Sequence, residues 1–489
     1  MPTPPTNDKT LPSFVKPALL DVLDDLQLVW DVWHSLKGCK AEYLPQEERE
    51  PPKAYTNRLK RTRFDNRYTP AIKGYAGLLT QFALLEDTAE TIASNIENID
   101  QQGNSLKAFL LQADEMVLRD GGCGILVEFP IDPTDETGEP LIQSAADEQE
   151  FGLRPYVVLI DRRNILNWDV SYIQGIPVIN RVTIAETVEV PDGEFGCTMR
   201  TRYRVLRPGS YQVWELQLVQ GQWIKYLVDE GVTNLDRVPL IWYSLSKGEL
   251  FKGSLPFQDV AELNIEHFQK RSENNEVLRK CNLPVPVRKG YQRSPEEIKS
   301  GAKLTIGPNS LVDVPVDGDF YFAEPTGNAI ASTQANITAL EEAIDRLSLA
   351  FLTGGEAQKT ATEVIIDSAQ CQSSLQSMAE RKASAVQQVF EFWTQYTGEE
   401  AIGGIAVDAK VLKLPSSAQD VQVILDAMGL KISNKLGLQM LLERGWLPEE
   451  TDLEEELQLI EEVQPALATV DNKPLASGNQ IDEEAANAA

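Results

Sequence analysis

The feature that most constrains this chain is a helix–insert–helix pattern between Ser254 and Gly355. The first helix is predicted over residues 254–282, because Ser254 and Pro256 stand where a cap and a first-turn proline belong and Pro284 follows the end. At 1.5 Å per residue such a helix would be on the order of 40 Å long. Two helices of this length with a small insert between them are an uncommon arrangement, so we interpret the rest of the chain around them.

The returning helix is predicted over residues 326–352 and carries one narrow apolar seam. The seam residues recur at alternating spacings of three and four: Ile337, Leu340, Ile344, Leu347 and Phe351. Glu341 and Asp345 lie off this seam, at a spacing where like charges repel each other. We therefore expect both carboxylates where water reaches them.

The middle of the first helix is polar on every side. Residues 269–276 contain no apolar side chain. A helix that is polar all round for two turns is not expected to be buried there. We predict that this part of the helix bridges two packed regions.

The insert, residues 283–325, is predicted to be a small α/β unit. Ser294 to Glu297 read as a capping box with a proline at the first helical position. Short strand-like runs flank it at 285–288, 304–306, 311–314 and 320–322.

Residues 1–253 are predicted to form one α+β domain with antiparallel strands and flanking helices. Helices are expected within 16–36, over 69–85, and over 104–119 with Asn104 as the cap. Alternating apolar residues between turn signals predict seven strands. They are 124–129, 156–160, 178–184, 200–206, 211–219, 223–228 and 238–243.

After the returning helix, residues 353–360 read as a polar loop with paired glycines. A long helix is predicted over 361–397 and a strand over 405–412. A helical trio follows at 417–428, 433–444 and 452–462. Residues from 464 onward are rich in Ala, Asn, Asp and Glu and are expected to be disordered.

Composition excludes several classes of protein. The 489 residues carry 45 basic and 74 acidic side chains, a formal charge of −29. Such a surface argues against wrapping DNA, although not against a channel through which DNA slides. No apolar run approaches the ~20 residues that span a bilayer, and the first residues lack a signal peptide. The five scattered cysteines support neither a zinc site nor a disulfide framework.

The motifs of enzymes are also missing from the sequence. It has two histidines, His34 and His267, and no zincin, nucleophile-elbow or phosphate-loop signature. Asp120 to Cys123 follow a helix and precede a strand, which favours a helix C-cap over a phosphate loop. Cys123 is expected to be a buried small residue. We predict no catalytic site, cofactor or metal.

One basic cluster stands out in this acidic chain: Arg58, Lys60, Arg61, Arg63 and Arg67. Pairing with an acidic surface on a neighbouring segment or subunit is the favoured interpretation. Direct contact with DNA is the alternative.

The order of these parts resembles the portal, or head–tail connector, proteins of tailed double-stranded DNA bacteriophages. The local likeness lies in the helix start from Pro256 to Asn264, in Ile432 to Lys435, in Gly437 to Leu447, and in the acidic helix 452–462. In the terms of that family, the expected fold is α+β, divided as follows. Residues 1–253 would be the wing, 254–282 the first stem helix, 283–325 the clip, 326–352 the second stem helix, 353–360 the channel loop, 361–415 the long wing helix and strand, 416–463 the helical crown, and 464–489 an acidic tail.

The resemblance implies a ring, commonly of twelve subunits, at one vertex of the capsid of a virion assembled in the host cytoplasm. Double-stranded DNA would pass through its axis during packaging and ejection. The implied partners are the terminase motor, a head–tail adaptor and the major capsid protein.

Site residues follow from the same resemblance. The channel loop would present Thr353, Gly354, Gly355, Glu356, Gln358 and Lys359 at the narrowest point of the channel, although an ordinary helix–helix turn is the alternative. Glu341 and Asp345 would line the channel along the stem. The clip would offer a docking surface of Arg288, Lys289, Arg293, Glu296 and Lys299.

Two other classes of function remain open at this point. One is a capsid scaffold or adaptor without a channel. The other is an enzyme of the DNA-packaging pathway, which the absent phosphate loop and absent ligand clusters argue against.

Overall fold

The computed structural model divides the chain into two compact units, Met1–Val411 and Leu412–Ala489. In the first unit it describes residues 3–130, 152–245, 250–281, 287–289, 295, 312–314, 327–348 and 361–407. In the second it describes 424–426, 428, 433–443, 447, 451–454 and 456–458. The fold is mixed helix and antiparallel sheet, so the predicted α+β class is confirmed.

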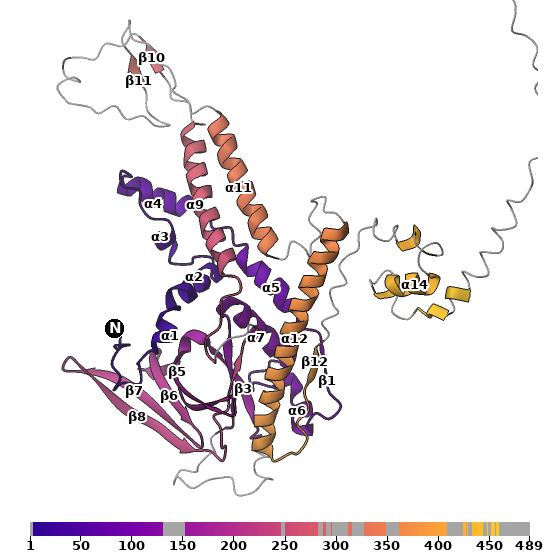
Figure 1. Ribbon diagram of the computed structural model, residues 1–489. Helices are drawn as coiled ribbons and strands as arrows, with labels where there is room; N and C mark the ends of the chain where they lie inside the picture. The colour runs from indigo at the N-terminus through magenta and orange to yellow at the C-terminus, as the bar shows by residue number, and fades with distance from the viewer. Residues whose placement is uncertain are drawn as a thin grey trace, which may run out of the picture. The chain divides into compact units, whose positions relative to one another are not determined.

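The largest sheet has five strands in sequential order. They are β4 (Ile165–Ile173), β5 (Ile176–Asp192), β6 (Gly196–Arg207), β7 (Ser210–Val219) and β8 (Gln222–Val232). Every neighbouring pair is antiparallel and joined by a short turn. Figure 1 labels β5, β6, β7 and β8 of this sheet. β5 to β8 were predicted and β4 was missed, although its polar residues Asn167, Asp169 and Ser171 alternate with Trp168, Val170 and Tyr172 in the pattern of a strand.

A second sheet has three strands, with β2 (Cys123–Glu128) between β3 (Tyr156–Asp161) and β9 (Leu240–Tyr243). The central strand β2 is buried along nearly its whole length. It follows α7 (Leu106–Asp120), whose end is closed by Gly121 at a φ of 77° as predicted. The cap at the start of α7 is Ser105 instead of Asn104, because the Ser105 hydroxyl accepts a hydrogen bond from the Ala108 amide (3.3 Å).

The two sheets share one apolar core with the N-terminal helices. Leu126 of β2, Val182 of β5 and Leu206 of β6 pack into it together with Leu19 and Leu26. The last two residues belong to α1 (Pro17–Leu20) and α2 (Leu23–Trp33). A short 3-10 turn, η2 (Arg162–Asn164), links β3 to β4.

The predicted helix over 69–85 is wrong in its second half. α5 (Tyr68–Leu78) ends early, and β1 (Phe82–Leu84) pairs antiparallel with β12 (Ile405–Val407). Pairing with a strand more than 300 residues away overrides the local helical pattern. The other elements before α7 are α3 (Lys40–Tyr43), α4 (Pro52–Arg61), α6 (Glu90–Ser94) and the 3-10 turn η1 (Ile96–Asn98).

The two long helices are α9 (Gln258–Cys281) and α11 (Gly327–Leu347), and they pack against each other. His267 contacts Glu341, and about two turns further along α9 Asn274 contacts Gln334, two turns earlier in α11. The pair is therefore an antiparallel hairpin. The third long helix, α12 (Ala361–Thr397), has the predicted bounds and packs against β2, β9 and β12.

The predicted seam of α11 is only partly covered. Ile337 and Ile344 are buried, whereas Leu347 at the end of the helix is 45% exposed. Among the described residues, the covered part of the seam therefore ends at Ile344. Phe351 lies outside the described residues.

Within the insert the structure describes two short strands, β10 (Val287–Lys289) and β11 (Val312–Val314). They pair in parallel. Both coincide with predicted strand runs, and the runs at 304–306 and 320–322 lie outside the described residues. In the second unit, α14 (Asn434–Glu443) coincides with the middle helix of the predicted trio.

Candidate functional site in the helical hairpin

The polar middle of α9 is covered by an N-terminal segment of the same unit, residues 62–67. The hydroxyls of Thr62 and Ser272 lie 3.0 Å apart, and both side chains are buried. Asn264 accepts from the amide of Arg67 (3.0 Å) and donates to the carbonyl of Asp65 (2.8 Å). The expectation that residues 269–276 are not buried therefore holds for Arg271, Glu273 and Asn275, which are exposed, and is wrong for Ser272 and Asn274. The buried Ser272 hydroxyl finds its polar partner in Thr62.

Arg67 bridges the two acidic residues that the sequence analysis placed on the channel. Its guanidinium lies 3.1 Å from a carboxylate oxygen of Glu341 and 3.4 Å from one of Asp345. The side chain of Asp345 is 58% exposed, and that of Glu341 is 32% exposed. The repulsion between the two carboxylates is thus relieved by an arginine as well as by water, which the sequence argument did not foresee.

His267 is completely buried between the helices. Its Nε2 lies 3.1 Å from a carboxylate oxygen of Glu341, and its Nδ1 has no hydrogen-bond partner. His267 is therefore part of the packing between α9 and α11.

Asp65, His267 and Glu341 place three potential metal ligands within 4.8 Å of one another. Two arginines contact the carboxylates of this group: Arg271 lies 3.0 Å from Asp65, and Arg67 pairs with Glu341. A metal ion would compete with two guanidinium groups that already neutralise these carboxylates. The arrangement is therefore an ion-pair network that holds the hairpin to residues 62–67.

Some residues of the basic cluster pair with carboxylates of the same chain, and others are exposed without such a pair among the described residues. Arg58 is buried on Glu50 (2.7 Å), whose hydrogen bonds raise the pKa of the guanidinium, and Arg61 pairs with Glu276 of α9. Lys60 and Arg63 are exposed and form no ion pair with any described residue. The favoured interpretation, pairing with acidic groups of a neighbouring segment, thus describes Arg58, Arg61 and Arg67.

Of the other residues predicted for the site, the structure describes only Arg288 and Lys289. Arg288 and Lys289 lie on β10, whose backbone alone is described. The remaining clip residues and the whole channel loop lie outside the described residues: Arg293, Glu296, Lys299, Thr353, Gly354, Gly355, Glu356, Gln358 and Lys359. Their roles stay predictions.

A fully buried ion pair that the sequence analysis missed connects α12 to α7. The Lys382 ammonium donates to Asp114 (2.6 Å) and to the carbonyl of Leu79 (2.7 Å), and the Tyr243 hydroxyl donates to Asp114 (2.5 Å). Burial raises the pKa of Asp114 to about 6, and the ammonium limits that rise. A lone lysine in a long helix gives no sequence signal for such a position. Cys123 is buried as predicted, and burial raises the pKa of its thiol.

Comparisons with known proteins give one family match and several structural matches. A family model described as a domain of unknown function, DUF4055, matches residues 256–397, the region from the start of α9 to the end of α12. It covers less than half of the chain. No curated protein matches the sequence.

The similar solved structures include gene transfer agent (GTA) particles. The virion of a native GTA particle matches at a TM-score of 0.35 and 11% identity, covering 84% of this chain and 98% of that chain. The neck of an empty GTA particle, computed with C6 symmetry, matches at a TM-score of 0.34 and 12% identity, covering 82% of this chain and 96% of that chain. The neck of a native GTA particle, computed with C12 symmetry, matches at a TM-score of 0.33 and 11% identity, covering 78% of this chain and 89% of that chain. Because these TM-scores are below 0.5, the function proposed below rests on the contacts within this chain.

Proposed function

We propose that this chain is the subunit of a portal-like ring at one capsid vertex, through which double-stranded DNA passes during packaging and ejection. The observation that carries the proposal is the antiparallel hairpin of α9 and α11 with an inserted unit between the helices. Glu342, Asp345 and Arg346 are exposed on α11, and the buried contacts lie on its other side. A side-by-side ring of such hairpins would surround an axial channel.

The charge of the chain supports passage of DNA without tight binding. Each cation that neutralises a phosphate adds salt-dependent affinity, so a basic channel would retain the duplex. Three of the five cluster cations are occupied by carboxylates of the same chain. Asp345 remains largely exposed. On this proposal Glu341 and Asp345 lie along the channel, with Arg67 reducing their charge.

The other parts take roles that follow from the ring. The loop 353–360 would be the constriction of the channel, and the insert between α9 and α11 would dock the packaging motor and later a tail adaptor. Residues 1–253 would contact neighbouring subunits and the capsid. The subunit would act as a structural component without catalysis of its own.

Native mass spectrometry of the purified chain at micromolar concentration and moderate salt tests this proposal. A closed oligomer of one defined stoichiometry, expected near twelve, supports it. A monomer alone, or an open-ended series of masses, contradicts it. Phosphate release from ATP above a mock preparation would contradict the non-enzymatic part.

A further inference from the structure

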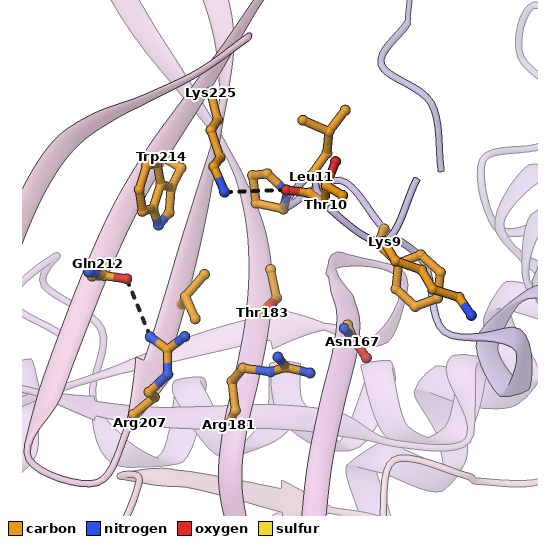
Figure 2. A pocket seen from close by; sticks show the side chains of 13 residues that line it. Lys9, Thr10, Leu11, Asn167, Arg181, Thr183, Arg207, Gln212, Trp214 and Lys225 are labelled. Atoms are coloured by element: carbon orange, nitrogen blue, oxygen red, sulfur yellow. Dashed lines mark hydrogen bonds between the residues drawn. The ribbon is translucent and has the colours of Figure 1, made fainter. Parts of the chain in front are cut away.

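A pocket of about 190 Å³ lies on the five-stranded sheet, beneath the N-terminal segment. Figure 2 shows the cations Arg181, Arg207 and Lys225 around it with the indole of Trp214, and Lys9 at its edge. Threonine, asparagine, glutamine and apolar side chains complete the lining, which contains no carboxylate. We name these five residues the cationic pocket.

The cations of this pocket have unused binding capacity. Arg207 donates to the amide oxygen of Gln212 (3.3 Å), and Lys225 donates to the carbonyl of Thr10 (3.3 Å). The buried Nε of Arg181 has no hydrogen-bond partner. Among the described residues none of the four forms an ion pair, although Asp169 lies opposite Arg181 in the strand register. In a chain of charge −29, such a group of unpaired cations is suited to an anionic ligand.

A complementary surface lies at the tip of the hairpin formed by β5 and β6. The strands pair as far as Asp192 and Gly196, and Gly193 turns with a φ of 76°. Phe195 is 95% exposed at this tip, and Asp192 and Glu194 beside it are exposed. No described cation pairs with either carboxylate. An aromatic ring flanked by two free carboxylates matches the cations and indole of the pocket.

The tip cannot enter the pocket of its own chain. Arg181 and Arg207 stand at the opposite end of the same two strands, next to the pair Val182 and Leu206. Eleven residues of strand at ~3.3 Å each separate them from the tip by roughly 35 Å. Contact between tip and pocket therefore requires a second copy of the chain. Because the two surfaces differ, the contact is heterologous, and it repeats around a ring when the rotation from one subunit to the next closes.

We propose that the β5–β6 tip of one subunit docks in the cationic pocket of the next, with Asp192 and Glu194 on the cations and Phe195 against Trp214. This inference rests on the ring of the proposed function and names the contact that closes it. Docking would exclude water from the ion pairs, which makes the contact stronger than exposed pairs of the same residues.

Charge reversal in mixed rings tests the contact. One variant carries Asp192→Lys and Glu194→Lys, and the other carries Arg207→Glu and Lys225→Glu. All four positions are exposed, so circular dichroism should show unchanged folding. By native mass spectrometry, each variant alone should lose at least tenfold in its ring fraction. An equimolar mixture should recover rings in which the two variants alternate, because the acidic tips then meet unmodified cationic pockets and the lysines of the other tips meet the carboxylates introduced at positions 207 and 225.

The outcomes separate this inference from the proposed function. If the unmodified chain forms no ring, the proposed function fails. If the unmodified chain forms rings and either variant alone assembles equally well, or the mixture does not recover, the docking contact is refuted while the ring stands. Glu97→Lys with Glu86→Lys adds the same charge at exposed positions away from the tip and should leave assembly within twofold of the unmodified chain.

Discussion

At the scale of single residues, the buried charges decide how the helices are held. Asp114 and Lys382 are both fully buried, so neither can lose its partner without leaving a charge in the core. Arg67 acts differently, because it lies partly in solvent and joins the 62–67 segment to α11. Mutations in the buried pair Asp114–Lys382 should therefore lower the stability of the fold, whereas mutation of Arg67 should act locally on α11.

Replacing Lys382 by Met should destabilise the fold by roughly 3–5 kcal/mol, because Asp114 stays buried without its cation. Asp114→Asn should cost a similar amount, and the double variant should cost less than the sum of the two. Urea unfolding followed by circular dichroism measures these differences. Lys107→Met, an exposed position on α7, is the control and should stay within about 0.5 kcal/mol. Additive costs of the two single variants would show that the pair is not coupled.

Replacing Arg67 by Gln should loosen α11 without unfolding the domain. The exposed ion pairs are worth about 0.5–1.5 kcal/mol together, so amide hydrogen exchange within 337–347 should accelerate about two- to tenfold. Arg63→Gln removes a cation that pairs with no described residue and should leave exchange unchanged. Equal protection in both variants would show that Arg67 does not hold α11.

At the scale of elements, the long helices were predictable and their surroundings were only partly so. The bounds of α12 and the positions of β5 to β8 follow from periodicity and turn residues, which act locally. β1 was missed because its partner β12 lies more than 300 residues away. The burial of Ser272 in the polar middle of α9 was missed for the same reason, since Thr62 contacts it from a distant part of the chain.

The candidate site shows the same limit. Glu341 and Asp345 were recognised from their position off the apolar seam, whereas their shared contact with Arg67 needed the fold. The cationic pocket gave no sequence signal, because Lys9, Arg181, Arg207 and Lys225 come from separate strands and from the N-terminal segment.

Asp345→Lys should slow the passage of DNA through an assembled ring at low salt. An added cation on the channel surface binds phosphates, and this binding weakens as salt rises, so the rate should recover at higher salt. Translocation by the packaging motor measures the effect. Glu97→Lys introduces the same charge outside the hairpin and should leave the rate unchanged. An unaltered rate for Asp345→Lys at low salt would refute a channel position for this residue.

Deleting Gly354 to Lys359 should leave the ring intact but impair packaging or retention of DNA. The paired glycines make the backbone of this loop easy to bend, which suits a constriction. Genome length per particle, compared with particles of the unmodified chain, measures the effect. Full-length packaging would favour the alternative of an ordinary turn between helices.

At the scale of the whole molecule, the account depends on a closed ring. A subunit with acidic tips, a cationic pocket and a long hairpin offers different surfaces on different sides, as a heterologous assembly requires. Acidic residues at Glu342 and Asp345 then face water in the assembled state as they do in the single chain.

Electron microscopy of the purified assembly viewed along its axis tests this claim most directly. The account predicts a ring with an axial hole, about twelve repeats, and the α9–α11 hairpins surrounding the hole. A filled disc, a filament, or a ring whose hairpins point away from the axis would contradict it.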